Sequence, residues 1–186
     1  MVSQEERLKI FESELDLILD DSIRHFTELC LYAAPEYFFT DCPASSTGRY
    51  HPLDELSWDG TILHTKKVVT AAYELCRGLG CEHRRDEILS GCIIHDLLKQ
   101  GITKTGHTTK SHPALAADLV ERIQRDTQIL KDDSYNIIRC CCGFHYGLWS
   151  QKPWQKSLDE YTPEELCVYI SDYTVSKRCM QVDYRR

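Results

Sequence analysis

The spacing of apolar residues along this chain is helical almost throughout, and this spacing restricts the possible folds more than any other feature. Apolar residues recur every three or four positions over 5–31, which places them on one side of a helix. Further helices are predicted over 65–77, over 86–99, from Pro113 onward, over 132–142 and over 163–177. No hairpin pattern of alternating strands and turns stands out. The sequence therefore predicts an all-α fold, a helical bundle.

Capping residues mark several of the predicted helix boundaries. Asp20-Asp21-Ser22 predicts a break in the first helical stretch, with Asp21 or Ser22 capping its second half. Thr162-Pro163-Glu164-Glu165 is a capping box with proline at the first helical position. These signals place the ends of the helices but not their packing.

Residues 36–62 interrupt the helical pattern with prolines and glycines and carry several aromatic side chains. A loop of this length is either a lid or binding loop, or an ordered connector packed on the core. We therefore expect one domain over 1–186. It would comprise N-terminal helices (1–35), the aromatic-rich loop or lid (36–62) and a helical core (63–180).

Composition and charge exclude several classes of protein. The 186 residues are 42% hydrophobic and 27% charged, which suits one folded core. No segment approaches the roughly 20 apolar residues of a membrane span, and the first residues lack the pattern of a signal peptide. The net charge of −7 argues against a nucleic-acid polymer as partner. We expect a soluble, cytoplasmic protein that binds no membrane, with homo-oligomer formation left open.

The ten cysteines form no C-x-x-C pair. The run Cys140-Cys141-Cys142 is a poor chelator, because adjacent side chains diverge. Without an export signal, a disulfide framework is not expected. We predict that most of the thiols are small buried hydrophobic groups.

Six titratable residues lie on the inward faces or at the edges of the predicted helices: His64, His95, Asp96, His112, His145 and Asp172. A lone inward histidine is usually a satisfied core residue, and a lone inward aspartate is costly unless it is paired or bound to metal. Six separate buried partners would be needed on that interpretation, whereas one metal centre explains all six residues. Helical bundles build such centres from facing helices, and imidazole and carboxylate are common metal ligands.

The order and local context of these residues resemble the HD-domain superfamily of metal-dependent phosphohydrolases. The segment Ile93-Ile94-His95-Asp96-Leu97-Leu98-Lys99 resembles the family's apolar-apolar-His-Asp-x-x-Lys signature. Residues 105–113 resemble the segment that holds the third histidine, and 168–173 resemble the closing segment with the last aspartate. The resemblance covers about 60–180 and implies that the core 63–180 is a metal-binding bundle of the HD type.

The resemblance also implies a ligand set. Members with four ligands hold one ion, here through His64, His95, Asp96 and Asp172. Members with both intervening histidines are usually dinuclear, with His112 and His145 on the second ion and Asp96 bridging. The resemblance therefore implies two divalent or redox metal ions, drawn from Fe, Mn, Zn, Ni, Co and Mg. Two such ions would bring four positive charges to an acidic protein and so attract an anionic substrate.

The function implied is hydrolysis of a nucleotide or another small phosphate ester by a metal-bridged hydroxide. Lys99 and Asp96 are the implied catalytic residues. Lys99 would also contact the substrate phosphate. Arg178 resembles an arginine of dinucleotide-cleaving relatives, and His107 is a further candidate substrate contact in a loop rich in glycine and threonine.

Two alternatives stay open. A minority of HD folds with the same six ligands hold a di-iron centre and use dioxygen to cleave a C–P or C–C bond. A catalytically inactive metal-dependent binding or sensor domain is the other alternative. The run after His145 lacks the Gly-Tyr-Pro of the cyclic-di-GMP phosphodiesterase branch, which argues against that branch. Trp149 and Trp154 either stack on a base or close the end of the bundle.

Overall fold

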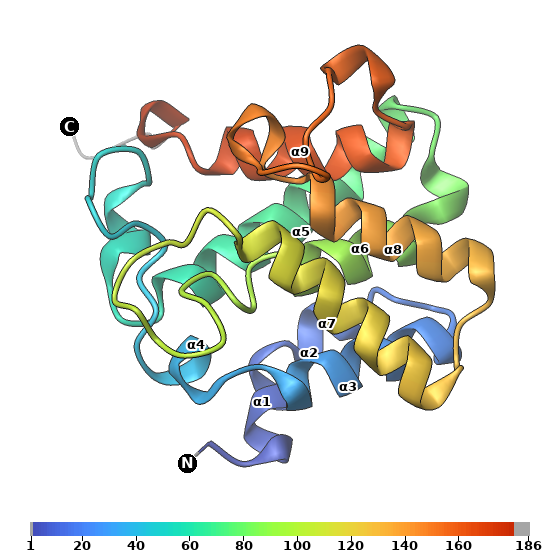
Figure 1. Cartoon of the computed structure of the whole chain (residues 1–186), viewed down its shortest axis with the longest axis horizontal. Coiled ribbons are helices and arrows are strands. Elements are labelled where there is room, and N and C mark those ends of the chain that lie inside the picture. Colours follow the sequence, from blue (N-terminus) through green and yellow to red (C-terminus); the bar gives the residue numbers. More distant parts are fainter. Residues whose placement is uncertain (1, 181–186) are drawn as a thin grey trace.

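A computed structural model describes residues 2–180, and the fold over that range is helical, as predicted (Figure 1). Within it lie nine α-helices and no β-strand: α1 (Gln4–Ile10), α2 (Glu12–Leu15), α3 (Asp21–Ala33), α4 (Glu36–Thr40), α5 (Gly60–Gly78), α6 (Arg85–Ile94), α7 (His112–Thr127), α8 (Asp132–Phe144) and α9 (Pro163–Val175). Short 3₁₀ turns connect several of them, among them η1 (Leu53–Leu56) and η3 (Gly147–Trp149). No described helix is long and apolar enough to cross a membrane.

Two sequence-based boundaries need correction near the N-terminus. The chain breaks before α3 as predicted, but Asp20 is the cap instead of Asp21 or Ser22, because its carboxylate accepts from the backbone N–H groups of Ser22 and Ile23. The loop predicted over 36–62 contains α4, and α5 begins inside it at Gly60. The aromatic run of α4 is buried on the core, so packing supports a helical turn there.

The segment after α6 also differs from its predicted form. The helix predicted over 86–99 ends at Ile94, and tighter turns follow it. In these turns the N–H of Leu97 bonds to the carbonyl of Ile94, and the N–H of Lys99 bonds to that of Asp96. The tighter winding brings Asp96 and Lys99, three residues apart, onto one side of the chain.

Helix α6 lies at the centre of the bundle. Every residue from 87 to 94 is buried, and α6 packs against α3, α5, α8 and α9. Helices α7 and α8 run side by side on one flank, and α5 packs against α9. One hydrophobic cluster joins these layers, from Phe11 near the N-terminus to Val168 in α9. Eight of the ten cysteines are buried and all ten are free thiols, which confirms the prediction for most of them.

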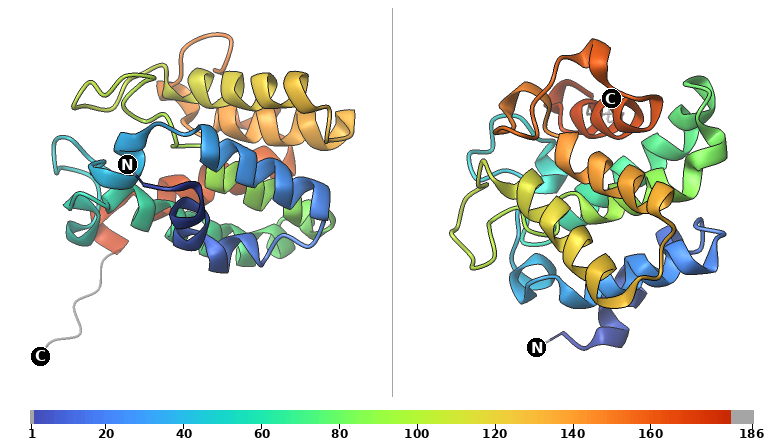
Figure 2. Two further views of the ribbon diagram at one scale, coloured as in Figure 1. Left: turned by 90° about the horizontal axis from the view of Figure 1, so that it is seen from below. Right: turned by 45° about the vertical axis from the view of Figure 1, so that its right-hand side comes forward.

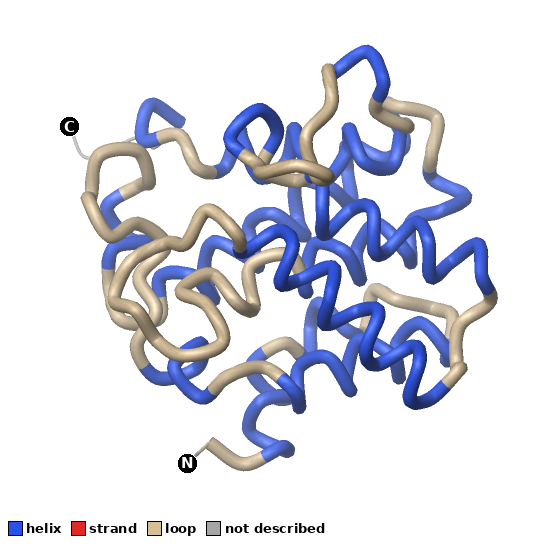
Figure 3. Tube along the Cα trace, viewed as in Figure 1, coloured by secondary structure: helices blue, strands red, loops and turns tan. Residues whose placement is uncertain are grey.

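Long loops gather at one end of the bundle. The segments 41–59 and 101–111 both lie there, beside the C-terminal end of α9, and two further views show the same arrangement (Figures 2 and 3). The helices thus form a rigid support, and the loops surround whatever lies at that end.

Trp154 packs on the bundle near α8 and is only 7% exposed. Its ring covers Gly143 so closely that an added Cβ would lie 1.9 Å from a ring carbon. Trp149, in contrast, is 55% exposed. Trp154 therefore closes the bundle, whereas stacking of Trp149 on a base stays a prediction.

We expect Gly143→Ala to lower the free energy of unfolding by about 1–3 kcal/mol, because the new methyl group would overlap the Trp154 ring. Gly78→Ala is the matched control, since nothing lies within 4 Å of the added Cβ at that helical glycine. Its stability should be unchanged or raised by up to about 1 kcal/mol. Urea unfolding followed by circular dichroism measures both, and equal stabilities would contradict the packing of Trp154 on Gly143.

Candidate metal centre

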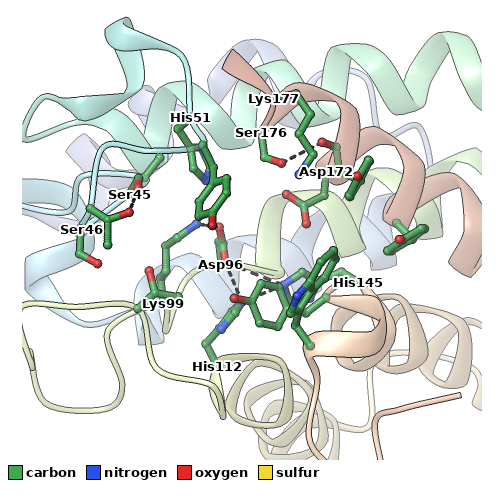
Figure 4. A pocket seen from close by; sticks show the side chains of 18 residues that line it. Ser45, Ser46, His51, Asp96, Lys99, His112, His145, Asp172, Ser176 and Lys177 are labelled. Atoms are coloured by element: carbon green, nitrogen blue, oxygen red, sulfur yellow. Dashed lines mark hydrogen bonds and ion pairs between the residues drawn. The ribbon is translucent and has the colours of Figure 1, made fainter. Parts of the chain in front are cut away.

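The six residues predicted as ligands meet at the loop-bearing end of the bundle, where four of them are labelled in Figure 4. Helix α5 carries His64, the turn after α6 carries His95 and Asp96, α7 begins with His112, the residue after α8 is His145, and α9 carries Asp172. The first five are buried, and the side chain of Asp172 is 15% exposed. The structure thus brings the six residues together, and their role as metal ligands stays a prediction.

Three of the histidines are oriented by the backbone in the same way. His95, His112 and His145 each have Nδ1 within 2.6–2.7 Å of the carbonyl oxygen three residues earlier in the chain. A carbonyl only accepts, so each Nδ1 carries the proton and donates it. With Nδ1 protonated in this way, Nε2 is the atom of each ring that presents a lone pair to the centre of the site.

These lone pairs lack protein donors. The Nε2 atoms of His112 and His145 lie 3.0 Å apart, although two lone pairs repel each other. Within residues 2–180, neither His95 Nε2 nor Asp96 Oδ1 has a hydrogen-bond partner of acceptable geometry. Buried polar atoms without partners are costly, and a cation among them would satisfy all four. The donor set of imidazole nitrogens and carboxylate oxygens therefore fits a divalent metal ion.

Asp96 lies between the imidazoles and Lys99. Its Oδ1 is 3.3 Å from His112 Nε2 and 3.9 Å from His145 Nε2. Its Oδ2 is 3.5 Å from His95 Nε2 and 2.5 Å from Lys99 Nζ. The two oxygens of one carboxylate thus face different groups.

Burial and neighbouring charges set the protonation states here. Burial opposes ionisation of Asp96, but Lys99 and His95 outweigh it and hold the pKa of this carboxyl well below its usual range. Burial also opposes the charge on Lys99, yet Asp96 raises the pKa of the ammonium group. Burial, together with His95 and His112, lowers the pKa of His145 to about 3. The site therefore holds a carboxylate, an ammonium group and a neutral ligand-ready imidazole.

His64 lies between two carboxylates. Its Nε2 is 2.9 Å from Asp172 Oδ1, and its Nδ1 is 3.2 Å from Glu55 Oε2. Burial lowers the pKa of His64, but these two carboxylates outweigh it and raise the pKa to about 9. A carboxylate on the far nitrogen is the usual way to orient a metal-binding histidine. Glu55 thus acts on His64 from outside the predicted ligand set.

Sequence reasoning missed Glu55 and its other partner, His51. Glu55 is fully buried, and its Oε2 lies 2.8 Å from His51 Nδ1. Burial opposes ionisation of Glu55, but hydrogen bonds from His51 and His64 hold its pKa below the usual range. The available signal was the i, i+4 spacing of His51 and Glu55 just before the helix of His64.

A cavity of about 430 Å³ opens above these residues, lined by Asp96, Lys99, His112, His145 and Asp172. Its lining includes five aromatic side chains: Tyr50, Tyr146, Trp149, Tyr169 and Tyr173. It also includes the polar residues Ser45, Ser46, Thr47, His51 and Thr108. Trp149 and Tyr173 stack with ring centroids 6.2 Å apart and an interplanar angle of 13°.

Two predicted substrate contacts lie outside this cavity. His107 is exposed, and its Nδ1 lies 3.1 Å from the carbonyl of Thr105 in its own loop. Arg178 is also exposed, and its backbone N–H bonds to the carbonyl of Tyr50 in the neighbouring loop. Lys177, one residue earlier, lines the cavity instead. Helix α9 ends at Val175, so the turn that follows determines which basic residue faces inward.

The arrangement defines the class of protein: an all-α bundle whose helix ends bring imidazoles and carboxylates into one buried, metal-compatible cluster. The family model described as HD domain matches residues 61–176, and the chain belongs to that family. All six residues of the cluster lie within the matched segment. No curated protein and no solved structure matches the chain significantly. HD domains are mostly metal-dependent phosphohydrolases, so the family supports a hydrolase of this kind.

We expect a chelator to lower the thermal unfolding midpoint by about 5–10 °C relative to protein with Mn²⁺ at about 100 times its Kd. The cation stabilises the fold because it satisfies buried lone pairs. His112→Ala should lose this metal-dependent stabilisation, whereas His107→Ala, outside the cavity, should keep it. Differential scanning fluorimetry measures the shift, and an unchanged shift in His112→Ala would argue against a cation at His112.

Proposed function

We propose that this chain is a metal-dependent phosphohydrolase or phosphodiesterase that hydrolyses a nucleotide or another small phosphate ester. The observation that supports it most is the position of Asp96 between two groups of imidazoles. Its Oδ1 faces His112 and His145 at 3.3 and 3.9 Å. Its Oδ2 faces His95 and His64 at 3.5 and 4.0 Å. A carboxylate in this position suits a bridging ligand of two cations, the arrangement that clamps a phosphoryl group.

The shape of the cavity supports a small substrate. A volume of about 430 Å³ matches pockets that enclose one small molecule. The stacked rings of Trp149 and Tyr173 form a flat apolar surface on which a planar group such as a nucleobase would stack. A phosphate ester with a planar leaving group would fit both the metal-binding floor and this wall.

Two divalent cations, when bound, supply Lewis-acid stabilisation of the phosphoryl group and activate water. The chain's own residues orient the reaction. Lys99 remains charged in its buried position beside Asp96 and lines the cavity, so its ammonium group is placed to bind a phosphoryl oxygen. Hydrogen bonds from the Nδ1 atoms to the backbone keep the imidazoles of His95, His112 and His145 from rotating.

Replacing His95 or Asp96 with alanine is expected to reduce hydrolysis to background, a loss of more than about 10²-fold, because phosphoryl charge loses its stabilisation. The measurements, with Mn²⁺, Fe²⁺ or Zn²⁺, are phosphate release from a panel of nucleoside monophosphates and alcohol release from simple diesters. His107→Ala serves as the control, and circular dichroism verifies the helical content of each variant.

The outcomes separate the possible functions. Full activity in His95→Ala would contradict the proposal. Oxygen uptake with cleavage of a C–P or C–C bond, seen only in iron-loaded protein under air, would identify the oxygenase chemistry instead. Metal binding without turnover of any kind would leave a binding or sensor domain. Elemental analysis of the wild-type protein should give close to two ions per chain.

Lys177→Gln is expected to raise KM about fivefold with little change in kcat, because a cavity-lining charge worth about 1 kcal/mol binds substrate and transition state alike. Arg178→Gln, which removes the neighbouring exposed charge, should leave both constants unchanged. Steady-state kinetics on the best substrate of the panel test the pair. A larger effect at Arg178 would restore the original sequence-based prediction and argue against Lys177.

A further inference from the structure

His51 lies in the cavity but belongs to no segment of the predicted ligand set. Figure 4 shows it above Asp96, on the side away from His112. Its side chain is 12% exposed, and its ring packs edge to face on His64, with centroids 4.9 Å apart. Within residues 2–180, its Nδ1 bonds to Glu55 and no group bonds to its Nε2. A polar atom of the cavity wall is thus left for a ligand.

Glu55 joins His51 to the metal centre. Its Oε2 is 2.8 Å from His51 Nδ1 and 3.2 Å from His64 Nδ1, and its Oε1 is 2.8 Å from Lys67 Nζ. An ionised carboxylate accepts hydrogen bonds and donates none, so the Nδ1 atoms of His51 and His64 both carry protons. In His51 the lone pair is therefore on Nε2, which faces the cavity. His64 Nε2 lies 2.9 Å from Asp172 Oδ1 and donates to that carboxylate in this structure, and a cation bound there would replace its proton.

The backbone holds Glu55 in place. Its carbonyl accepts a hydrogen bond from the N–H of Ala44 at 3.0 Å. The start of α5 approaches the same carbonyl so closely that a Cβ at Gly60 would lie 1.9 Å from it. Only glycine fits at this contact, so the backbone of Glu55 is closely constrained. The hydrogen bonds from His51, His64 and Lys67 then hold its carboxylate between the two histidines.

We propose that Glu55 is a positioning residue shared by His64 and His51, and that His51 accepts a hydrogen bond at Nε2 from a hydroxyl group of the substrate. The substrate class is a phosphate ester that carries a hydroxyl close to its phosphoryl group, because His51 packs directly on the ligand His64. This inference rests on the proposed function for its phosphate ester. The tautomers and the hydroxyl preference are measurable without turnover.

A third cation is the competing interpretation, because His51, Glu55 and His64 also cluster within metal-binding range. Such a cation would displace the protons that now form the hydrogen bonds at 2.8 and 3.2 Å. These two hydrogen bonds already satisfy the Nδ1 atoms of His51 and His64 and the Oε2 atom of Glu55, so none of the three needs a cation. Metal stoichiometry distinguishes the two interpretations.

The tautomers are tested by the imidazole ¹⁵N shifts of metal-free and Zn²⁺-loaded protein. We expect His51 to show a protonated Nδ1 and a bare Nε2, with its signals identified by their loss in His51→Asn. Glu55→Gln, which keeps the shape of the side chain, should mix the tautomers and weaken Zn²⁺ binding about 10–100-fold. Unchanged tautomers in Glu55→Gln, or a protonated Nε2 in the wild type, would overturn the positioning role. The wild-type spectrum alone suffices if that variant does not fold.

The hydroxyl contact is tested with two non-hydrolysable probes, 2-hydroxyethylphosphonate and ethylphosphonate, by calorimetry on Zn²⁺-loaded protein. Wild-type protein should bind the hydroxylated probe about 5–10-fold more tightly, the effect of one hydrogen bond. His51→Asn keeps a donor to Glu55 but has no atom at the Nε2 position, so the preference should vanish with metal content unchanged. His51→Gln, whose amide reaches that position, should retain part of it.

The possible results distinguish the hydroxyl contact, a metal-ligand role of His51 and the proposed hydrolase activity from one another. Equal affinity for the two probes, or binding of neither, overturns the hydroxyl contact. A lower metal content in His51→Asn makes His51 a ligand and also overturns the inference. A hydroxyl preference and the expected tautomers in a protein that hydrolyses no ester would support the inference while the proposed hydrolase activity fails.

Discussion

Asp96 is a carboxylate buried among four imidazoles and an ammonium group, and the arrangement of the bundle follows from the need to stabilise it. An unpaired buried charge is too costly to keep. Here Lys99 compensates one oxygen at 2.5 Å, while the other faces the lone pairs of His112 and His145. Those lone pairs cannot stabilise an anion, so the cluster is complete only with cations. The same deficit that makes the metal-free core costly makes it compatible with divalent metal binding.

Helix ends explain why the imidazoles face the right way. The last carbonyls of a helix have no partner within it. His95 follows the end of α6 and His145 follows the end of α8, and each uses such a carbonyl to bind its own Nδ1–H. The ends of these two helices therefore also select the tautomer of His95 and His145, in which the lone pair of Nε2 is available to a metal. A longer α6, as the hydrophobic pattern alone predicts, would occupy the carbonyl that His95 needs.

The difference between regular helices and the turns that join them shows which parts of the site were predictable from sequence. Helical periodicity places a residue on a face, so the all-α fold and the convergence of the six cluster residues followed from spacing. Features outside regular helices did not follow, because no period relates them to the core. Glu55 and His51 lie around a 3₁₀ turn, α4 forms through burial of its aromatic rings, and the turn after α9 brings Lys177 inward instead of Arg178. The position of Asp20 as cap was missed by one residue because three adjacent residues are all good caps.

Glu55 gives the site a property that the six cluster residues alone would lack. One rigid carboxylate bonds to a histidine of the metal centre and to a histidine of the cavity wall, so the orientations of the two rings are linked. A shift of Glu55 would disturb metal binding and substrate contact together, and the close approach of Gly60 to its carbonyl opposes such a shift. Preorganisation of this kind removes the entropy cost of aligning two groups at the moment of binding. The loop before α5, which has the least regular sequence near the site, is in this way as closely constrained as the helices that carry the metal-compatible cluster.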